Sequence, residues 1–277
     1  MGAFGDLSRI NTNLQSLEAL RAMQLNNSEL GTRQLRLATG SKINRAEDDS
    51  AGYSIANKIG AKVRGQAQAL ANVGDAKSLL TIAEGSLSSV MEILMTMKEK
   101  TVQAANDTMS STERSYIDNQ LDALSAEITD ILTDTKFNSA SLFTSSSFSF
   151  HVEAEASDTF SVSIGTLSVA QLSVATGDIN VTSAANATGL LSSIDSAITT
   201  ISNKMGQIGD SQKRLTFKQE ALNVAINNNE AARSRIIDAD FAKEQMHIVK
   251  LQILQQTGTA AVAQANQAPQ SILQLLQ

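Results

Sequence analysis

The chain has 277 residues, a formal net charge of −6, no cysteine, no tryptophan and only 4% aromatic residues. The lack of cysteine excludes a disulfide framework and a thiolate metal site, and no basic block is present that would bind a phosphate backbone. We therefore expect no nucleic-acid partner and no thick globular core. Because Pro269 is the single proline, long helices are permitted almost everywhere.

The chain begins with a narrow apolar stripe that predicts a weak helix. Its members are Ile10, Leu14, Leu17, Leu20 and Met23. Polar and charged residues interrupt the apolar ones in this region, and the longest apolar runs of the chain are far shorter than the about 20 residues that cross a bilayer. We therefore expect no cleavable secretory signal and no insertion into a membrane.

Heptad seams follow in the middle of the chain, where apolar residues alternate spacings of four and three. The first seam comprises Ala76, Leu80, Ala83, Leu87, Val90, Leu94, Met97 and Thr101. After a polar interruption, the second comprises Ile117, Leu121, Leu124, Ile128 and Ile131. A period of 3.5 residues keeps one stripe facing a partner. The pattern predicts a helix, a turn and an antiparallel return helix.

Residues 139–189 have a different character, rich in serine and threonine. Apolar and polar residues alternate in 147–152 and 159–164, and this period of two is typical of strands. We expect a β-hairpin that joins these two segments, with turns at Gly165, Gly177 and Gly189. The region would be a short, exposed β excursion from a helical protein.

A third seam and a second weak stripe complete the chain. The seam comprises Ile194, Ile198, Ile201, Met205, Ile208, Gln212, Leu215, Gln219, Leu222 and Ile226. The weak stripe comprises Met246, Val249, Ile253, Thr257 and Ala260. Such terminal segments would be ordered only by pairing with each other and with neighbouring molecules. The overall pattern predicts a mainly α fold, with a long antiparallel helical bundle or coiled coil built from both chain halves.

Several patches resemble the bacterial flagellin family. Near the N-terminus these are INTN at 10–13, RLATGSKINRAEDDSAGYSIA at 36–56, the helix that includes 83–87 and 102–106, and KFN at 136–138. Near the C-terminus they are ARSRIIDADFAKE at 232–244 and the segments at 253–258 and 265–273. The patches occur in the family's order at both ends, so the resemblance covers most of the chain.

The resemblance implies two domains, each assembled from both halves of the chain. Residues 1–43 and 242–277 would form a terminal helical core domain. Residues 44–241 would form an outer-tube helical domain with the β-hairpin insert at about 139–189. The bulky outer domains that many flagellins carry would be missing.

The function that the resemblance implies is that of a structural subunit, exported and polymerised through its N- and C-terminal helices into the bacterial flagellar filament for swimming motility. Its partners would be further copies of itself in a helical homopolymer, the flagellar cap and hook-filament junction proteins, and a flagellin export chaperone. The chain would be secreted and would reside in the filament.

The candidate site residues are therefore interface residues. Those expected between subunits are Ile10, Leu14, Leu17, Leu20, Arg36, Arg45, Asp48, Asp49, Val249, Ile253, Ala260 and Ile272. Those expected to bind the export chaperone are Met246, Ile253, Ile272 and Leu275; the alternative is that this segment is simply disordered before assembly.

The charged group near residue 48 has two interpretations. The resemblance favours charge pairing between subunits at the join of the two domains. The sequence alone favours a solvated loop whose acids cap a helix that begins near Ser50.

Signs of enzymatic chemistry are absent from the sequence. His151 and His247 belong to no metal-ligand spacing, and neither a nucleophile elbow nor a phosphate-binding loop is present. We predict no catalytic, cofactor or metal site. Two alternatives stay open: a hook-filament junction protein, which shares flagellin-like termini, and an autolytic or proteolytic filament protein, for which the insert supplies only His151 and scattered acids.

Overall fold

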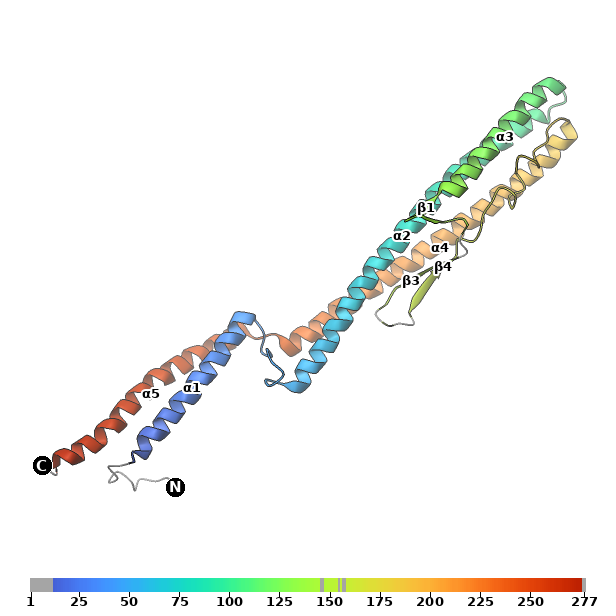
Figure 1. The fold of residues 1–277 in the computed structure, drawn as a ribbon. Helices are drawn as coiled ribbons and strands as arrows, with labels where there is room; N and C mark the ends of the chain where they lie inside the picture. The colour runs from blue at the N-terminus through green and yellow to red at the C-terminus, as the bar shows by residue number, and fades with distance from the viewer. Residues whose placement is uncertain (1–11, 145–146, 154, 156–157, 276–277) are drawn as a thin grey trace. The chain divides into compact units, whose positions relative to one another are not determined.

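The structure, a computed structural model, describes the chain except residues 1–11, 145–146, 154, 156–157 and 276–277, and it describes side chains in the last helix only as far as residue 267. The described elements, shown in Figure 1, are α1 (Leu14–Thr39), α2 (Ser50–Ala104), α3 (Ser111–Asp134), β1 (Lys136–Phe137), β2 (Ala140–Ser141), β3 (Phe148–His151), β4 (Thr159–Val162), α4 (Ala184–Ile237) and α5 (Phe241–Leu275). The chain is 74% helical, which confirms the predicted mainly α fold with a small strand region in its middle.

Polar side chains mark where several helices begin and end. The Asn13 side chain caps α1 by accepting from the backbone N–H of Ser16 at 3.1 Å. Ser110 and Glu113 form a reciprocal capping box at the start of α3. Gly40 ends α1 with a φ of 70°, a left-handed conformation that glycine adopts without steric cost.

The chain divides into two compact units. One contains Met1–Ala61 with Asn229–Gln277, and the other contains Lys62–Asn228. We call these the terminal unit and the central unit. The divisions fall inside α2 and α4, so each of these helices contributes to both units, whereas the expected domain limits lay in the segments next to α1 and α5.

The core of the central unit is built on the predicted heptad seams. All eight α2 seam positions from Ala76 to Thr101 are 0% exposed, which confirms that seam. On α4, the buried residues include Ile194, Ile201, Ile208, Leu215 and Leu222. The remaining α4 seam positions, Gln212 and Gln219 among them, are half-buried.

Polar bonds show that α2 and α4 run antiparallel. In order of residue number along α2, the first contact is from the Lys77 amine, which donates to Gln219 at 3.2 Å, and the next is at Glu84, which accepts from Gln212 at 2.8 Å. Further on, the Lys98 amine lies 2.6 Å from the Asp195 carboxylate. Partner numbers on α4 fall as numbers on α2 rise, as antiparallel pairing requires.

The predicted antiparallel return helix is also confirmed, as α3. At one end, the Arg114 side chain donates to the carbonyl of Ala104 at 2.9 Å and so satisfies a carbonyl at the end of α2. At the other end, the Thr135 hydroxyl donates to that of Ser86 at 2.9 Å. The described core therefore combines α2, α3 and α4.

The long helix α2 is apolar enough to pass a length-and-composition test for a membrane span. Residues such as Leu79, Leu87 and Leu94 belong to the buried cluster of the central unit, whereas Ile82 and Met95 of the same helix are exposed. Part of the hydropathy of α2 therefore serves the core.

The predicted hairpin is present as β3 and β4, which pair antiparallel with Phe148 opposite Val162 and Phe150 opposite Phe160. The sequence analysis did not predict a further hairpin, formed by β1 and β2, whose strands have two residues each. Its turn residues Asn138 and Ser139 both have positive φ, 47° and 67°. Asparagine tolerates this conformation better than most residues, so Asn138 was the residue that could have indicated a turn in the sequence.

The prediction that residues 139–189 form an exposed excursion is wrong. Leu142, Phe143 and Val174 of this segment are at most 1% exposed and belong to the same cluster as the helices. The segment covers an apolar face that the helices leave open, so burial of its hydrophobic residues is favourable. Gly189 does not mark a turn either, because it lies inside α4.

Candidate functional site

The two ends of the chain form an antiparallel helix pair, α1 with α5, within the terminal unit. The side chain of Asn13 donates to the carbonyl of Ala265 at 2.7 Å, and Ser16 donates to Asn266 at 2.8 Å. At the other end of the pair, Arg33 bonds to Glu244. The helices α1 and α5 lie side by side in Figure 1.

The inner face of α5 follows the spacing of a helical seam, but it is not the predicted stripe. Ile248 and Leu251 are each 5% exposed, and Gly258 faces Met23 of α1. On α1 no described residue is fully buried. The pair therefore buries little apolar surface for its length.

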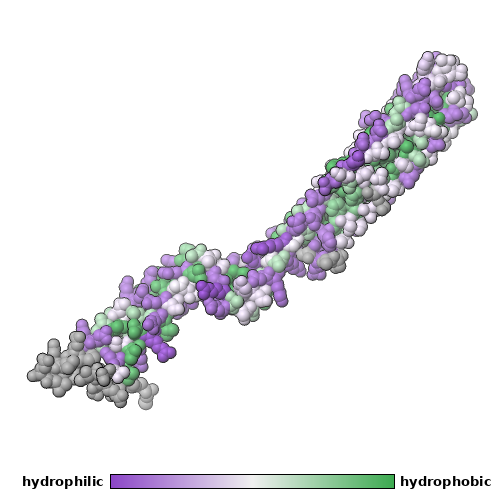
Figure 2. All heavy atoms as spheres, in the orientation of Figure 1, coloured by the Kyte–Doolittle hydropathy of each residue, from purple (hydrophilic) through white to green (hydrophobic). Residues whose placement is uncertain are grey.

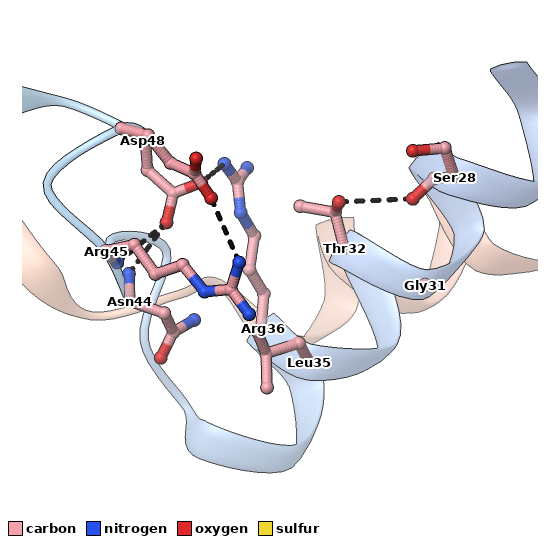
Figure 3. Close-up of a pocket in the computed structure, with 9 residues that line it drawn as sticks. Ser28, Gly31, Thr32, Leu35, Arg36, Asn44, Arg45 and Asp48 are labelled. Carbon is pink, nitrogen blue, oxygen red and sulfur yellow. Dashed lines mark hydrogen bonds and ion pairs between the residues drawn. The ribbon is translucent and has the colours of Figure 1, made fainter.

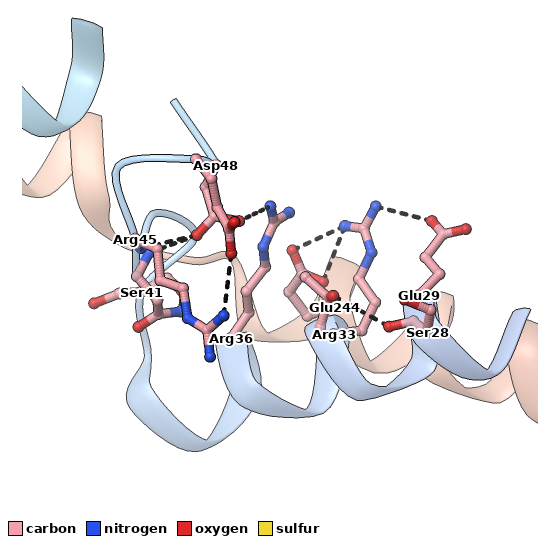
Figure 4. A network of polar contacts seen from close by, with 11 residues as sticks. Ser28, Glu29, Arg33, Arg36, Ser41, Arg45, Asp48 and Glu244 are labelled. Carbon is pink, nitrogen blue, oxygen red and sulfur yellow. Dashed lines mark hydrogen bonds and ion pairs between the residues drawn. The ribbon is translucent and has the colours of Figure 1, made fainter. Parts of the chain in front are cut away.

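Arg33 and Glu244 form the main charged contact across this pair. One guanidinium nitrogen lies 3.2 Å and 3.1 Å from the two Glu244 oxygens, and the other lies 3.3 Å from Glu29. Burial alone would lower the pKa of Arg33, but the bonds and charge of Glu244 and Glu29 outweigh it and raise the pKa. The guanidinium is therefore charged in the folded chain. Figure 4 shows this network.

Of the predicted charged residues, Arg36 in the last turn of α1 comes together with Arg45 and Asp48 of the loop between α1 and α2, as Figure 3 shows. Asp48 accepts from the backbone N–H groups of Asn44 and Arg45, both at 3.0 Å, and its carboxylate lies 3.7 Å from the Arg36 guanidinium. These bonds from Asn44 and Arg45, aided by the charge of Arg36, lower the pKa of Asp48.

The interpretation of this loop as a helix cap is confirmed at Asp49, whose carboxylate accepts from the backbone N–H of Gly52 at 2.9 Å as α2 begins. The Arg45 side chain pairs with Glu47 at 3.1 Å, and both side chains are exposed. These contacts lie within one chain. The groove beside the loop, lined by Arg36, Arg45, Glu47 and Asp48, carries both signs of charge and so does not select an ion of one sign.

The loop is also tied to the segment that joins α4 to α5, a contact the sequence did not indicate. The backbone N–H of Lys42 donates to the carbonyl of Ile237 at 2.6 Å, and that of Ala239 donates to Gly40 at 2.8 Å. Ser41 and Asp238 form an isolated antiparallel bridge. Both helix-to-helix connections of the terminal unit are thereby held together by backbone hydrogen bonds.

Apart from Met23, which is half-buried against Gly258, the described large hydrophobic residues of the predicted stripes face outwards. Leu14, Leu17 and Leu20 are 47%, 55% and 39% exposed, and Val249 and Ile253 are 46% and 58% exposed. Figure 2 shows hydrophobic surface among hydrophilic residues over the region of α1 and α5.

Of the remaining stripe candidates, the structure describes two, Met246 and Ala260. Met246 is 65% exposed and Ala260 is also exposed. Ile10 lies outside the described residues, as do the side chains of Ile272 and Leu275, whose backbone belongs to α5. Within the described part of the chain, no group of three histidine or acidic residues could hold a metal ion.

Paired terminal helices with outward apolar stripes, together with a helical bundle that buries the α2 seam, place the chain in a class of mainly helical proteins. The chain belongs to the bacterial flagellin family. Residues 10–147 match the bacterial flagellin N-terminal helical region, and residues 191–276 match the bacterial flagellin C-terminal helical region.

Relatives and a solved structure agree with this assignment. The chain is 34% identical to the flagellar filament 33 kDa core protein of Treponema phagedenis and 34% identical to a flagellin of Halalkalibacterium halodurans, in each case over 96% of this chain and 99% of the relative. A putative flagellar hook-associated protein from Vibrio parahaemolyticus shares the fold, with a TM-score of 0.60 and 15% identity over 69% of this chain and 100% of that chain.

These matches confirm the predicted role as a structural subunit of the flagellar filament. Flagellins are structural filament proteins and not enzymes, as the sequence predicted. The hook-filament junction alternative is less supported, because the likeness to the hook-associated protein is one of fold.

Proposed function

We propose that the subunit is exported and polymerises through the outward apolar stripes of α1 and α5, with Leu14, Leu17 and Leu20 packing against Val249, Ile253 and Ala260 of neighbouring copies. The observation that carries this proposal is the exposure of these stripes in a chain whose central unit buries the whole α2 seam and much of the α3 and α4 seams. Assembly would remove the stripes from water, and each buried aliphatic side chain contributes about 1.5 to 3 kcal/mol.

Two further candidates continue the predicted stripes along the sequence. Ile10 precedes Leu14 by four residues, and Ile272 follows Ala260 on α5, so both would join the interface between copies. The charged loop has a more limited role in the proposal. Arg36, Arg45, Asp48 and Asp49 are engaged within the chain, and the exposed Arg45 is the member best placed for a further contact with a neighbour.

Seeded elongation tests the polymerisation proposal. Purified chain is added to short filament fragments, and filament length is measured by negative-stain electron microscopy. Ile253→Glu should stop elongation, while Gln252→Glu, the same charge change at the next exposed position of α5, should leave it intact. Leu17→Glu and Gln15→Glu form the matching pair on α1. Equal elongation by the members of both pairs would contradict the proposal.

The site that we propose for an export chaperone lies on the same apolar stripe of α5. We infer that a flagellin export chaperone covers Met246, Ile253, Ile272 and Leu275 before assembly, because Met246 and Ile253 are 65% and 58% exposed and a free stripe of this kind would associate prematurely. The cognate chaperone should then inhibit seeded elongation at one copy per subunit. Met246→Glu should weaken chaperone binding in calorimetry, and unchanged binding would exclude this surface.

The remaining partners and the location follow from the same proposal. The flagellar cap would meet the subunit at the growing tip, the hook-filament junction proteins would meet it at the base, and the assembled protein would lie outside the cytoplasm. Immunogold labelling of cells with antibody against the chain tests the location. Label along whole filaments supports the proposal, whereas label confined to a short collar at the base would favour the junction protein.

A further inference from the structure

The α1–α5 pair has a seam that hydrophobic packing alone does not align. Its fully buried apolar contacts in the described residues are Ile248 and Leu251 on α5, and α1 contributes none. The rest of the seam is small, polar or half-buried. Because a seam of alternating three and four spacings repeats about every seven residues, sliding one helix by two turns brings seam positions into line again.

Charge distinguishes these alignments. In the observed alignment the Arg33 guanidinium meets both oxygens of Glu244, whose side chain is 9% exposed. A slide of about seven residues in one direction places Glu244 opposite Asn26, and in the other direction it places Arg33 opposite Leu251. Either slide leaves a buried charge without its partner, and such a state is strongly disfavoured.

Neutral contacts at the opposite end favour the same alignment. Asn13 uses its side-chain oxygen to cap α1 and its nitrogen to bond the carbonyl of Ala265, and Ser16 bonds to Asn266. These groups are half-buried or exposed, so water can replace their bonds at lower cost than it can replace a buried ion pair. The ion pair is therefore a stronger determinant than these contacts. At its own end of the helix pair it acts together with the backbone bonds from Lys42 to Ile237 and from Ala239 to Gly40.

We propose that the Arg33–Glu244 pair sets the register of α1 against α5, and so decides which apolar residues stand together on the outer surface of the terminal unit. The two residues act as positioning residues within the chain. The consequence for assembly rests on the proposed function, whereas the register itself is a property of the single chain.

The chain offers a direct assay of register, because it has no cysteine. A Cβ on Gly258 would lie 3.8 Å from the Cβ of Met23, close to the mean of about 3.8 Å found in disulfides. The variant Met23→Cys/Gly258→Cys therefore reports the observed register. Ser16→Cys with Gly258→Cys, and Met23→Cys with Ala265→Cys, report slides of about seven residues in the two directions and leave Ile248 and Leu251 in place.

Each cysteine pair is placed in three backgrounds and oxidised in a glutathione buffer as dilute monomer, and cross-linked chains are counted by mass spectrometry. The first background is otherwise unchanged. The second carries Arg33→Met/Glu244→Met, which removes both charges and keeps the helices paired, since apolar replacement of a whole buried ion pair is often neutral or stabilising. The third carries Arg233→Met/Glu230→Met, the same replacement in an exposed Arg–Glu pair.

With the ion pair intact, and in the exposed-pair control, only the observed-register disulfide should form in quantity. With Arg33 and Glu244 replaced, the slid disulfides should rise about tenfold, which corresponds to a loss of about 1.4 kcal/mol of register preference. If the yield of the slid disulfides is the same in all three backgrounds, other contacts set the register, such as packing at Ile248 and Leu251 or the backbone bonds between residues 40–42 and 237–239, and the proposal is overturned.

Seeded elongation of the same variants without cysteines separates the two proposals. Loss of elongation together with slid disulfides in the Arg33→Met/Glu244→Met chain supports both. Slid disulfides with normal elongation keep the register proposal and contradict its consequence for the apolar surface. A failure of the unchanged chain to elongate competent seeds contradicts polymerisation and leaves the register assay unaffected.

Discussion

The helices of the central unit and of the terminal unit carry apolar residues at the same alternating spacings of three and four, yet the two units bury these residues to different degrees. Along α2 in the central unit, seam side chains such as Leu87 and Leu94 are 0% exposed, whereas α1 has no fully buried residue among those described. In the central unit two further helices and the β-containing insert surround the seam. In the terminal unit two helices cover only one stripe of each other, so apolar residues on the remaining faces stay in water.

This difference explains how one chain can be folded and still ready to assemble. The central unit buries most of its seam residues within the chain. Under the proposed function, the terminal pair would gain less from folding alone and more from association, which would couple its full stability to the presence of neighbouring copies. The following predictions test this contrast, from the largest expected effect to the smallest.

Removing a seam side chain of the central unit should have the largest effect on stability. Leu87→Ala leaves a cavity at a 0% exposed position, and we expect the free energy of unfolding to fall by about 2 to 5 kcal/mol. Urea denaturation of the monomer followed by circular dichroism measures it. Met95→Ala, at a 55% exposed position of the same helix, should change stability by less than about 0.5 kcal/mol. Similar losses from both would show that the seam is not the core.

A glycine in the terminal unit tests how closely the loop before α2 is packed. A Cβ on Gly52 would lie 2.5 Å from an Asp49 oxygen and 2.8 Å from the terminal carbon of buried Ile43. Both side chains would have to shift, and Asp49 would lose its capping geometry, so the cost should exceed the gain in helix propensity and Gly52→Ala should destabilise the unit by about 0.5 to 2 kcal/mol. Gly74→Ala has open space around it and should stabilise its helix by about 0.5 to 1 kcal/mol. Thermal unfolding, with proteolysis of residues 40–49 as a local probe, distinguishes these opposite signs.

The capping box of α3 gives an intermediate effect within the central unit. The Glu113 carboxylate accepts from the backbone of Ser110 at 2.7 Å, and the Ser110 hydroxyl accepts in return from the Glu113 backbone at 3.3 Å. Ser110→Ala should cost about 0.5 to 2 kcal/mol of stability, measured by urea denaturation. Ser115→Ala, exposed in the next turn of the same helix, should be neutral or slightly stabilising. A neutral Ser110→Ala would mean that the box adds nothing.

Low pH should reduce the stability of the loop between α1 and α2 in the terminal unit, because Asp48 becomes protonated. Its pKa in the folded chain is lowered by the backbone bonds of Asn44 and Arg45 and by the charge of Arg36. The stabilisation is therefore complete above the unfolded-state pKa of about 4 and is lost as the pH falls through the lower folded-state pKa. Asp48→Asn should flatten the dependence of terminal-unit stability on pH in that acidic window. Thermal melts between neutral pH and that window measure it, and parallel curves for both chains would contradict the assignment.

Much of the fold could be predicted from the sequence because it is local. The α2 seam, the return helix α3 and the β3–β4 hairpin all follow from periods of 3.5 and two residues within single segments. The cap at Asp49 was predictable for the same reason, since a capping residue and the N–H groups it accepts from are neighbours in the chain.

Three features could not be predicted because they depend on which segments meet. Arg33 and Glu244 are 211 positions apart, and the sequence around each resembles an ordinary exposed helix. The bridge between Ser41 and Asp238 uses backbone groups, which every residue carries. Phe143 lies in a serine-rich segment whose composition predicted exposure to solvent. Only the packing of this segment against the helices buries Phe143, which is 1% exposed.

The sequence by itself therefore determined the helical class, the seams of the central unit, the hairpin and the membership in the flagellin family. The tertiary structure alone decided that α1 and α5 pair through a face other than the predicted stripes, which leaves Leu17 and Ile253 in water. The physical reason is that periodicity specifies which residues share a helix face, whereas the choice of the face that a partner covers depends on charge and packing across the pair.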